Sequence, residues 1–417
     1  MTITVAGHKI NVASFDEHFT CEQCDEIRTQ IRKKFTPAEM TEELTKLSQK
    51  STRTHNIINY YTRELLWDVK SEKYPLSMND CLDSDDFLRH IKGQVDNDLY
   101  KISSNPKFSH FTLAQRMLQL LKLEGKNMRV AGNYPINSVK NVLSQHKGKN
   151  KVYYDYSCGW GNRLLGSMVS DFEYLGTDPN HKLVEKLKMM YNNFKQIKGS
   201  AKADIRCQGS EIVVPEWKNK VDIAFSSPPY FDLEDYQHGN QSIKDRNYTR
   251  WLEEYWKPTV INIKLYLKED GLFLLNIKNT KEHALLDDMK KIAISCGFYY
   301  HYSDVLKTPT RPNVVARAGK ISSDEEILVF STLDVLDKSE ATIKRLEEIE
   351  QAKIVDFNNR QKYYEEVYAR HQEEIRIKKE YEDSLVTVDT NEWKKTIKSM
   401  KKYKKRKRVK AVPPSKQ

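Results

Sequence analysis

The sequence lacks the features that mark membrane and secreted proteins. Its 417 residues contain no run of about 18 apolar residues, so we expect no membrane-spanning helix. Residues 1–19 have no long apolar segment after a basic start, which argues against a secretory signal. By default, we expect a cytoplasmic protein.

Cysteine is sparse and scattered, which argues against a disulfide framework. The six cysteines are Cys21, Cys24, Cys81, Cys158, Cys207 and Cys296. Cys21 and Cys24 form one Cys-x-x-Cys pair, but a zinc site needs two further ligands, and His8 and His18 fit no common spacing. We therefore interpret the pair as reduced cysteines at the start of a helix and expect no metal.

Positive and negative charges balance over most of the chain, and the excess of positive charge lies in the tail. The formal net charge is +11, and Lys394–Lys410 contains eleven Lys or Arg residues and no acid. Such a segment, without apolar periodicity, is expected to be disordered in isolation. We predict that it binds nucleic-acid phosphates, with a solvated tail as the alternative. The predicted phosphate contacts are Lys401, Lys402, Lys404, Lys405, Arg406, Lys407 and Arg408.

A short apolar run followed by two prolines predicts a rigid loop at the end of a core strand. Val221–Phe225 is typical of a buried strand, and a Pro-Pro pair can continue neither a strand nor a helix. The Ser227 hydroxyl and the Pro228 carbonyl offer two acceptors, and Tyr230 offers a flat ring. Together they suit a planar group that carries an exocyclic amine. The alternative is an ordinary proline-stiffened loop.

A second motif predicts a nucleotide-type binding turn upstream. A strand over 152–155 ends at Asp155, and a turn with Gly159 and Gly161 precedes a helical pattern. The next strand ends at Asp178, at the spacing where an acidic residue commonly binds ribose hydroxyls.

Strands and helices alternate through the middle of the chain, which predicts a parallel sheet with right-handed crossovers. After these strands we expect a helix over 248–267 and a central strand over 272–277. Two last strands, 297–302 and 327–331, are expected to form an antiparallel edge pair. The strands that alternate with helices are expected at 152–155, 173–178, 203–207 and 221–225, with a helix over 181–195 between the second and third.

Together the two motifs resemble those of the DNA amino-methyltransferases, which methylate adenine N6 or cytosine N4. Asp155–Gly161 looks like their Asp-x-Phe-x-Gly-x-Gly cofactor motif, and Ser227–Tyr230 looks like their catalytic (Asp/Asn/Ser)-Pro-Pro-(Tyr/Phe) motif. The resemblance covers roughly residues 108–332, with the motif order of the gamma type. Ser157 and Trp160 depart from the family pattern, where Phe and Ser or Thr are common.

The resemblance implies a Rossmann-like methyltransferase domain that binds S-adenosylmethionine. It implies cofactor contacts by Asp155, Ser157, Gly159, Gly161, Asp178 and Ser210. It implies a catalytic loop of Ser227, Pro228, Pro229 and Tyr230. Residues 133–137 resemble a family segment that holds the methionine end of the cofactor, although a plain turn before a helix is an equal alternative.

Four regions are predicted: a helical N-terminal region over 1–105, the methyltransferase domain over 106–332, a charged helical extension over 333–390 and the basic tail over 391–417. The first either packs on the catalytic core or reads the DNA target. Within the extension, 336–385 has a loose coiled-coil pattern that favours a homodimer or folding back on the core. A polar loop over 307–313 either contacts phosphates or is simply solvated.

These observations predict a DNA methyltransferase that acts on the exocyclic amine of a flipped base. The alternatives are methylation of RNA or of a protein amide, and a non-catalytic DNA-binding protein on the same fold. The sequence argues against methylation at cytosine C5, because that reaction needs a cysteine after a proline and none of the six follows one. The resemblance also implies a place in restriction–modification.

Overall fold

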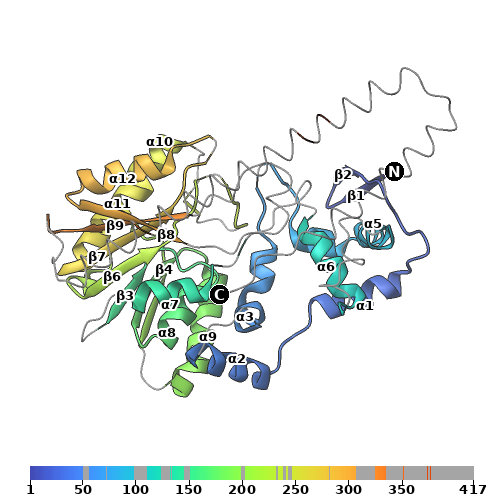
Figure 1. Ribbon diagram of the computed structural model, residues 1–417, viewed down its shortest axis with the longest axis horizontal. Helices are drawn as coiled ribbons and strands as arrows, with labels where there is room; N and C mark the ends of the chain where they lie inside the picture. The colour runs from blue at the N-terminus through green and yellow to red at the C-terminus, as the bar shows by residue number, and fades with distance from the viewer. Residues whose placement is uncertain are drawn as a thin grey trace. The chain divides into compact units, whose positions relative to one another are not determined.

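The structure is a computed structural model (Figure 1). The chain divides into two compact units. One unit comprises residues 1–308 and 324–337, and the other comprises 309–323 and 338–417. The residues described are 1–49, 56–71, 73–97, 110–123, 132, 134–144, 151–198, 202–231, 233–237, 241–242, 247–280, 282–306, 325–334, Gln351, Glu373 and Arg376. The last three are helical, and the rest of the predicted 336–385 helices, the 307–313 loop and the basic tail lie outside the described residues.

A seven-stranded sheet forms the centre of the first unit, in the order β5-β4-β3-β6-β7-β9-β8. The first five strands in this order are parallel, and β9 runs antiparallel to both of its neighbours. This confirms the predicted Rossmann-like methyltransferase fold, a mostly parallel sheet with an antiparallel edge. The strands are β3 (Val152–Asp155), β4 (Glu173–Asp178), β5 (Ala203–Cys207), β6 (Val221–Ser226), β7 (Leu267–Ile277), β8 (Tyr299–Leu306) and β9 (Glu325–Ser331).

The strand order reverses between β3 and β6, which are direct neighbours. Tyr153 pairs with Ile223 and Tyr154 with Ala224 in this parallel register. In open α/β sheets, ligands bind at the carboxyl ends of the strands beside such a reversal. The glycine turn and the Pro-Pro loop both start at this point, so the fold brings the two sequence motifs together.

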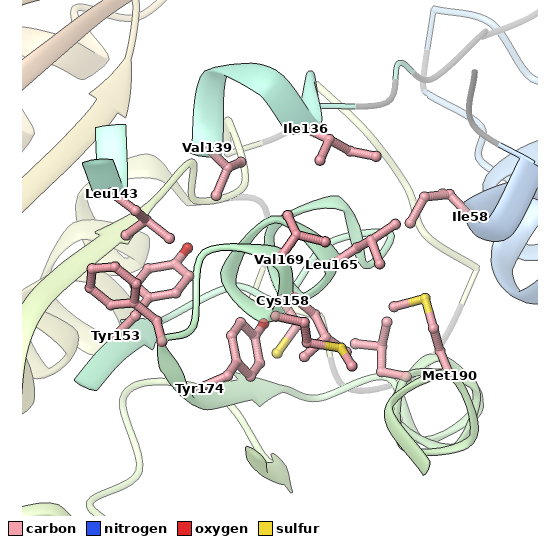
Figure 2. Packing of buried hydrophobic residues seen from close by; sticks show 14 of the residues in the cluster. Ile58, Ile136, Val139, Leu143, Tyr153, Cys158, Leu165, Val169, Tyr174 and Met190 are labelled. Carbon is pink, nitrogen blue, oxygen red and sulfur yellow. The ribbon is translucent and has the colours of Figure 1, made fainter. Parts of the chain in front are cut away.

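One face of the sheet is covered by α7 (Ile136–Ser144), α8 (Asn162–Val169) and α9 (His181–Lys198). Their apolar residues pack into one core with Tyr153 of β3 and Tyr174 of β4. Figure 2 shows Ile58 and Met190 directed into this cluster from two different helices. Ile58 lies on α3 (Asn56–Trp67), so the N-terminal region contributes to the core beneath the glycine turn.

The other face is covered by α10 (Tyr248–Trp251), α11 (Lys257–Tyr266), α12 (Leu285–Ser295) and the short η3 (Pro215–Trp217). The sequence predicts one helix over 248–267. The structure instead places a π-helical segment, η4 (Leu252–Trp256), between α10 and α11. Pro258 lies at the start of α11 and has no N–H to donate, which accounts for the interruption at this point.

The N-terminal region, residues 1–105, contains a hairpin and five helices in the described residues, and α6 follows it. Helices α2 and α3 pack against α8 and α9, whereas the hairpin, α1, α4, α5 and α6 form a core of their own. The elements are β1 (Thr2–Val5), β2 (His8–Asn11), α1 (Cys21–Ile31), α2 (Pro37–Gln49), α3 (Asn56–Trp67), α4 (Met78–Asp83), α5 (Asp85–Asp96) and α6 (Leu113–Leu123). No helix among the described residues is long and apolar enough to cross a membrane.

The Cys-x-x-Cys pair opens α1, as predicted. Thr20 caps this helix through the main-chain N–H of Gln23, and both cysteines are free thiols. Cys24 is buried and Cys21 is exposed. Across the described residues, no group of three or more His, Cys, Asp or Glu side chains is arranged to hold a metal ion.

Candidate functional site

The glycine turn adopts backbone conformations that explain its glycines. Gly159 has φ +54°, and Gly161, the residue that precedes α8, has φ +93°. A Cβ at Gly161 would lie 2.8 Å from a Leu187 methyl carbon and 2.9 Å from the Met190 methyl carbon. The turn therefore packs closely against α9, and a larger residue at Gly161 would push that helix away.

Asp155, at the end of β3, is a fully buried junction beneath this turn. Both of its carboxylate oxygens accept from Arg163 Nε, at 3.0 and 2.9 Å. The hydroxyls of Tyr174 and Ser226 donate to it at 2.9 and 2.7 Å, and the Ser157 main-chain N–H lies at 3.4 Å. The carboxylate thus fixes the turn from below, and its predicted direct contact with a cofactor stays a prediction.

Arg163 completes the junction from the first turn of α8. Burial alone lowers the pKa of its guanidinium, but the Asp155 carboxylate outweighs burial and the net shift is upward. Its Nη2 also donates to the Ser157 carbonyl, and the Tyr134 ring lies 5.3 Å from its central carbon. The turn is therefore held by a buried, hydrogen-bonded ion pair.

Asp178, at the end of β4, is partly exposed beside the same turn. Burial raises the pKa of this carboxyl to about 7, against the opposing effect of the hydrogen bond from Asn180 N–H. This net value includes a rise caused by the Asp155 charge and reductions caused by the Arg163 charge and the Gly159 N–H. The structure therefore places Asp178 next to Gly159, and its carboxyl titrates near neutral pH.

The loop after β5 packs against α11 and the π-helical segment. Ser210 is buried, with its hydroxyl 2.8 Å from Thr259 Oγ1 and its carbonyl accepting from Asn262 at 2.9 Å. The Tyr255 hydroxyl faces Ser157 and Ser210, and burial raises the pKa of this phenol. Glu211 Oε2 is buried and has no hydrogen-bond partner among the residues the structure describes.

The loop over Ser227–Tyr230 begins where β6 ends, and two tyrosines from the neighbouring strand segment fix that end. Tyr153 donates to the Phe225 carbonyl at 2.7 Å, and Tyr156 donates to the Ser226 carbonyl at 3.2 Å and the Leu274 carbonyl at 2.9 Å. These bonds hold the last residues of β6 in place before the prolines.

Within the loop, Pro228 is buried, whereas Ser227, Pro229 and Tyr230 are partly exposed. Ser227 and Tyr230 are therefore both partly accessible to solvent. The predicted catalytic loop thus lies beside the predicted cofactor turn, joined to it through the bond between Ser226 and Asp155.

Phe231, the next residue, has φ +54°, which is a strained conformation for a bulky side chain. Its buried ring contacts Tyr248, Trp251 and His283, with centroids 5.1–5.7 Å apart. The Tyr248 and His283 rings are stacked at 4.3 Å. This aromatic packing holds the strained residue and so fixes the direction in which the chain leaves the loop.

Three residues of the site were not singled out from the sequence: Arg163, Ser226 and Tyr255. Arg163 lies eight residues after Asp155 in the first turn of a helix, where a cation is unusual because the helix dipole favours anions there. That placement is a signal that a buried acid lies nearby. Ser226 and Tyr255 are recognisable only once the tertiary contacts are known.

No family model matches the sequence, and no curated protein matches it. Solved structures match at low identity. A TehB-like SAM-dependent methyltransferase from Corynebacterium glutamicum is 15% identical, with 54% of this chain and 99% of that chain covered at a TM-score of 0.33. TrmN from Thermus thermophilus is 11% identical, with 48% of each chain covered at 0.33. A putative RNA methyltransferase from Pyrococcus horikoshii is 16% identical, with coverages of 47% and 81% at 0.31. The fold assignment rests on the strand order itself, and the substrate is inferred below from this chain's own residues.

Proposed function

We propose that the chain is an S-adenosylmethionine-dependent amino-methyltransferase that acts on the exocyclic amine of a base in DNA. The observation that carries the proposal is the 2.7 Å bond between Ser226 and Asp155. It joins a glycine-rich, nucleotide-type turn to an acceptor-lined Pro-Pro loop at the point where the strand order reverses. Each motif by itself is a weak signal, and their placement on adjacent strands makes them one site.

The residues around the glycine turn suit S-adenosylmethionine, which is a nucleoside that carries a charged methionine group. Asp178 would accept hydrogen bonds from ribose hydroxyls, as acids at this place in nucleotide-binding folds commonly do. Glu211 Oε2 is a buried acceptor without a partner among the described residues, which suits a donor on the base. A Cβ at Gly159 would lie 3.2 Å from a guanidinium nitrogen of Arg163, so a larger residue here would crowd the arginine that holds the turn. When bound, S-adenosylmethionine supplies an electrophilic methyl group.

The Pro-Pro loop suits an amine acceptor. The exocyclic nitrogen of adenine or cytosine is a poor nucleophile, because its lone pair is delocalised into the ring. The Ser227 side chain and the Pro228 carbonyl would accept from its two N–H groups and draw the nitrogen towards sp³ geometry. Tyr230 would stack on the base, which must leave the duplex to be reached. Pro229 restricts the orientation of the Pro228 carbonyl.

DNA is the proposed substrate because the motif order and the catalytic loop resemble those of DNA enzymes, and because of the eleven cations in Lys394–Lys410. The target is cytosine N4 or adenine N6. The tail, the homodimer through 336–385 and the place in restriction–modification stay predictions.

The test is to incubate the full-length protein with labelled S-adenosylmethionine and either duplex DNA, RNA or a glutamine-containing protein extract. Products are digested, and the labelled nucleoside or amino acid is identified. We expect N4-methylcytosine or N6-methyladenine from DNA. Label in RNA or in a protein amide would replace DNA by that substrate.

A parallel measurement of melting temperature with S-adenosylhomocysteine separates failure of catalysis from failure of cofactor binding. Ligand at 100 times its Kd adds about 2.7 kcal/mol to the free energy of unfolding. A protein that neither shifts nor transfers label would contradict the proposal. One that shifts without transferring would indicate a non-catalytic binding protein.

A further inference from the structure

Asn276, in β7, has a buried side-chain amide whose oxygen accepts no hydrogen bond from the described residues. Its side chain is fully buried, and Nδ2 donates to the Glu326 carbonyl of β9 at 3.1 Å. Only the NH₂ half of an amide can donate to a carbonyl, so this bond fixes which way the amide faces. The other half, Oδ1, is buried without a hydrogen-bond partner in the described part of the chain. Buried polar atoms of folded proteins are rarely left in this state.

The sheet register places Asn276 close to the start of the Pro-Pro loop. In the parallel pair of β6 and β7, Phe225 pairs with Leu274 and Ser226 with Leu275. Ser227 and Asn276 are the next residues after this last pair, at which the two strands lie about 5 Å apart.

The Asn276 side chain lies on the face of the sheet covered by α7, α8 and α9. Leu274 belongs to the apolar cluster on that face. Side chains alternate along a strand with a period of two, so Asn276 is directed to the same face as Leu274. Asn276 lies near the carboxyl end of β7 and Ser227 directly follows β6, at the edge of the sheet where the site is located.

We propose that Asn276 Oδ1 is a further acceptor for the substrate's amine, acting together with the Ser227 hydroxyl. This inference rests on the proposed function and adds a residue to it. An amide oxygen carries no proton of its own, so it accepts without first having to place a hydrogen elsewhere, whereas the serine hydroxyl must. Asn276 therefore acts as a catalytic residue that holds one N–H of the amine, while the Pro228 carbonyl holds the other.

If the Ser227 and Asn276 side chains both accept the same N–H of the amine, a double-mutant cycle should show that their effects are coupled. If either Ser227 or Asn276 can receive the N–H, then Ser227→Ala and Asn276→Leu should each lower the single-turnover rate of methyl transfer by about tenfold. The double variant should lose more than the product of the two effects, because no side-chain acceptor is left. Residues that act independently would give the simple product.

Asn276→Leu keeps the shape of the side chain and removes the polar atoms, and Asn276→Ala serves as a second variant if the leucine does not fold. The matched control is Ser331→Ala. It removes a buried hydroxyl that bonds to His301 and Leu333, and Ser331 pairs with Leu272, four residues before Asn276 in β7. We expect the control to transfer methyl groups at the wild-type rate. We expect all variants to bind S-adenosylhomocysteine with wild-type affinity.

The experiment uses the full-length chain, labelled S-adenosylmethionine and the nucleic acid that the wild type methylates. Slow transfer in the asparagine variants, with unchanged cofactor affinity and more than multiplicative loss in the double variant, supports the inference. Wild-type rates in folded Asn276→Leu or Asn276→Ala protein would overturn it and leave the proposed function standing. A wild-type protein that methylates no amine would overturn both.

Discussion

Lys70 and Asp235 exchange two main-chain hydrogen bonds, at 2.9 and 2.8 Å, and so tie the N-terminal region to the segment that leaves the catalytic loop. Beside them, the rings of Tyr236 and Trp160 lie 6.0 Å apart, and Trp160 belongs to the glycine turn. Thr62 of α3 also donates to the Trp160 carbonyl at 3.0 Å. The N-terminal region therefore contacts the glycine turn and the segment that follows the catalytic loop. This agrees with the interpretation that it packs on the core, and its reading of a DNA target stays a prediction.

We predict that Asp235→Pro slows methyl transfer several-fold without changing cofactor affinity. Proline removes the N–H that donates to Lys70, which releases the segment after the catalytic loop. Asp235→Ala is the matched control, since it loses the carboxylate but keeps the N–H. The measurement is the single-turnover rate of methyl transfer in the two variants. Equal rates would show that the main-chain hydrogen bonds between Lys70 and Asp235 do not position the catalytic loop.

Removing Arg163 should destabilise the fold far more than removing an exposed arginine. Its side chain is 5% exposed and that of Asp155 is 0%, so Arg163→Met leaves a buried carboxylate unpaired. Such a change costs about 3–5 kcal/mol. Arg206→Met breaks a pair with Asp204 whose side chains are 41% and 37% exposed, which costs about 0–1 kcal/mol. Urea unfolding measures both, and similar losses would contradict the role assigned to Asp155 as the junction beneath the turn.

Cofactor affinity should rise with pH between about 6 and 8, because the pKa of Asp178 is raised to about 7 and ribose hydroxyls donate to the ionised carboxylate. The unliganded protein should change in the opposite sense. A carboxyl whose pKa is higher in the folded than in the unfolded state contributes stability that is full below the unfolded pKa of about 4 and is lost progressively as the pH rises to about 7. Asp178→Asn should flatten both the pH profile of cofactor affinity and that of stability. Calorimetric titration between about pH 6 and 8 and urea unfolding between about pH 4 and 8 are the measurements, and an affinity independent of pH in the wild type would exclude the assignment.

In the catalytic loop, Tyr230→Ala and Pro228→Ala should each lower methyl transfer by tenfold or more while cofactor still binds. The first removes the stacking surface, and the second frees the backbone that aims the carbonyl. Ser227→Ala should cost less than loss of the whole loop, because the Pro228 carbonyl remains. Tyr299→Ala, at an exposed tyrosine of β8, is the control. If the Tyr230 and Pro228 variants keep the wild-type rate, the loop is only a structural turn.

Deleting residues 394–417 should weaken DNA binding and flatten its salt dependence, yet leave the methylated site unchanged. Each phosphate contact contributes a slope of about −0.9 in a plot of log affinity against log salt, and such contacts carry no sequence information. DNA affinity at several salt concentrations, for the full-length and shortened proteins, measures the effect. Identical slopes would leave the tail as a solvated extension, and a changed methylation site would mean that it reads sequence.

The sequence by itself determined the strands, the two motifs and their order. Apolar runs ending at Asp155, Asp178 and Ser226 are local patterns, and a strand needs no distant information to be recognised. Proline and glycine likewise impose their turns locally, through a missing N–H at Pro228 and a positive φ at Gly161. The π-helical segment after Trp251 was missed, because a shift of one hydrogen bond leaves the apolar pattern of a helix unchanged.

Only the tertiary structure decided how these parts are joined. Asp155 reads from the sequence as a cofactor ligand, but the fold surrounds it with Arg163, Tyr174 and Ser226 from three different elements. The unused oxygen of Asn276 is equally invisible in the sequence, because whether a buried amide is satisfied depends on which carbonyl the next strand presents. Hydrogen-bond satisfaction and burial are properties of contacts between residues far apart in the chain, so they exist only once the sheet has formed.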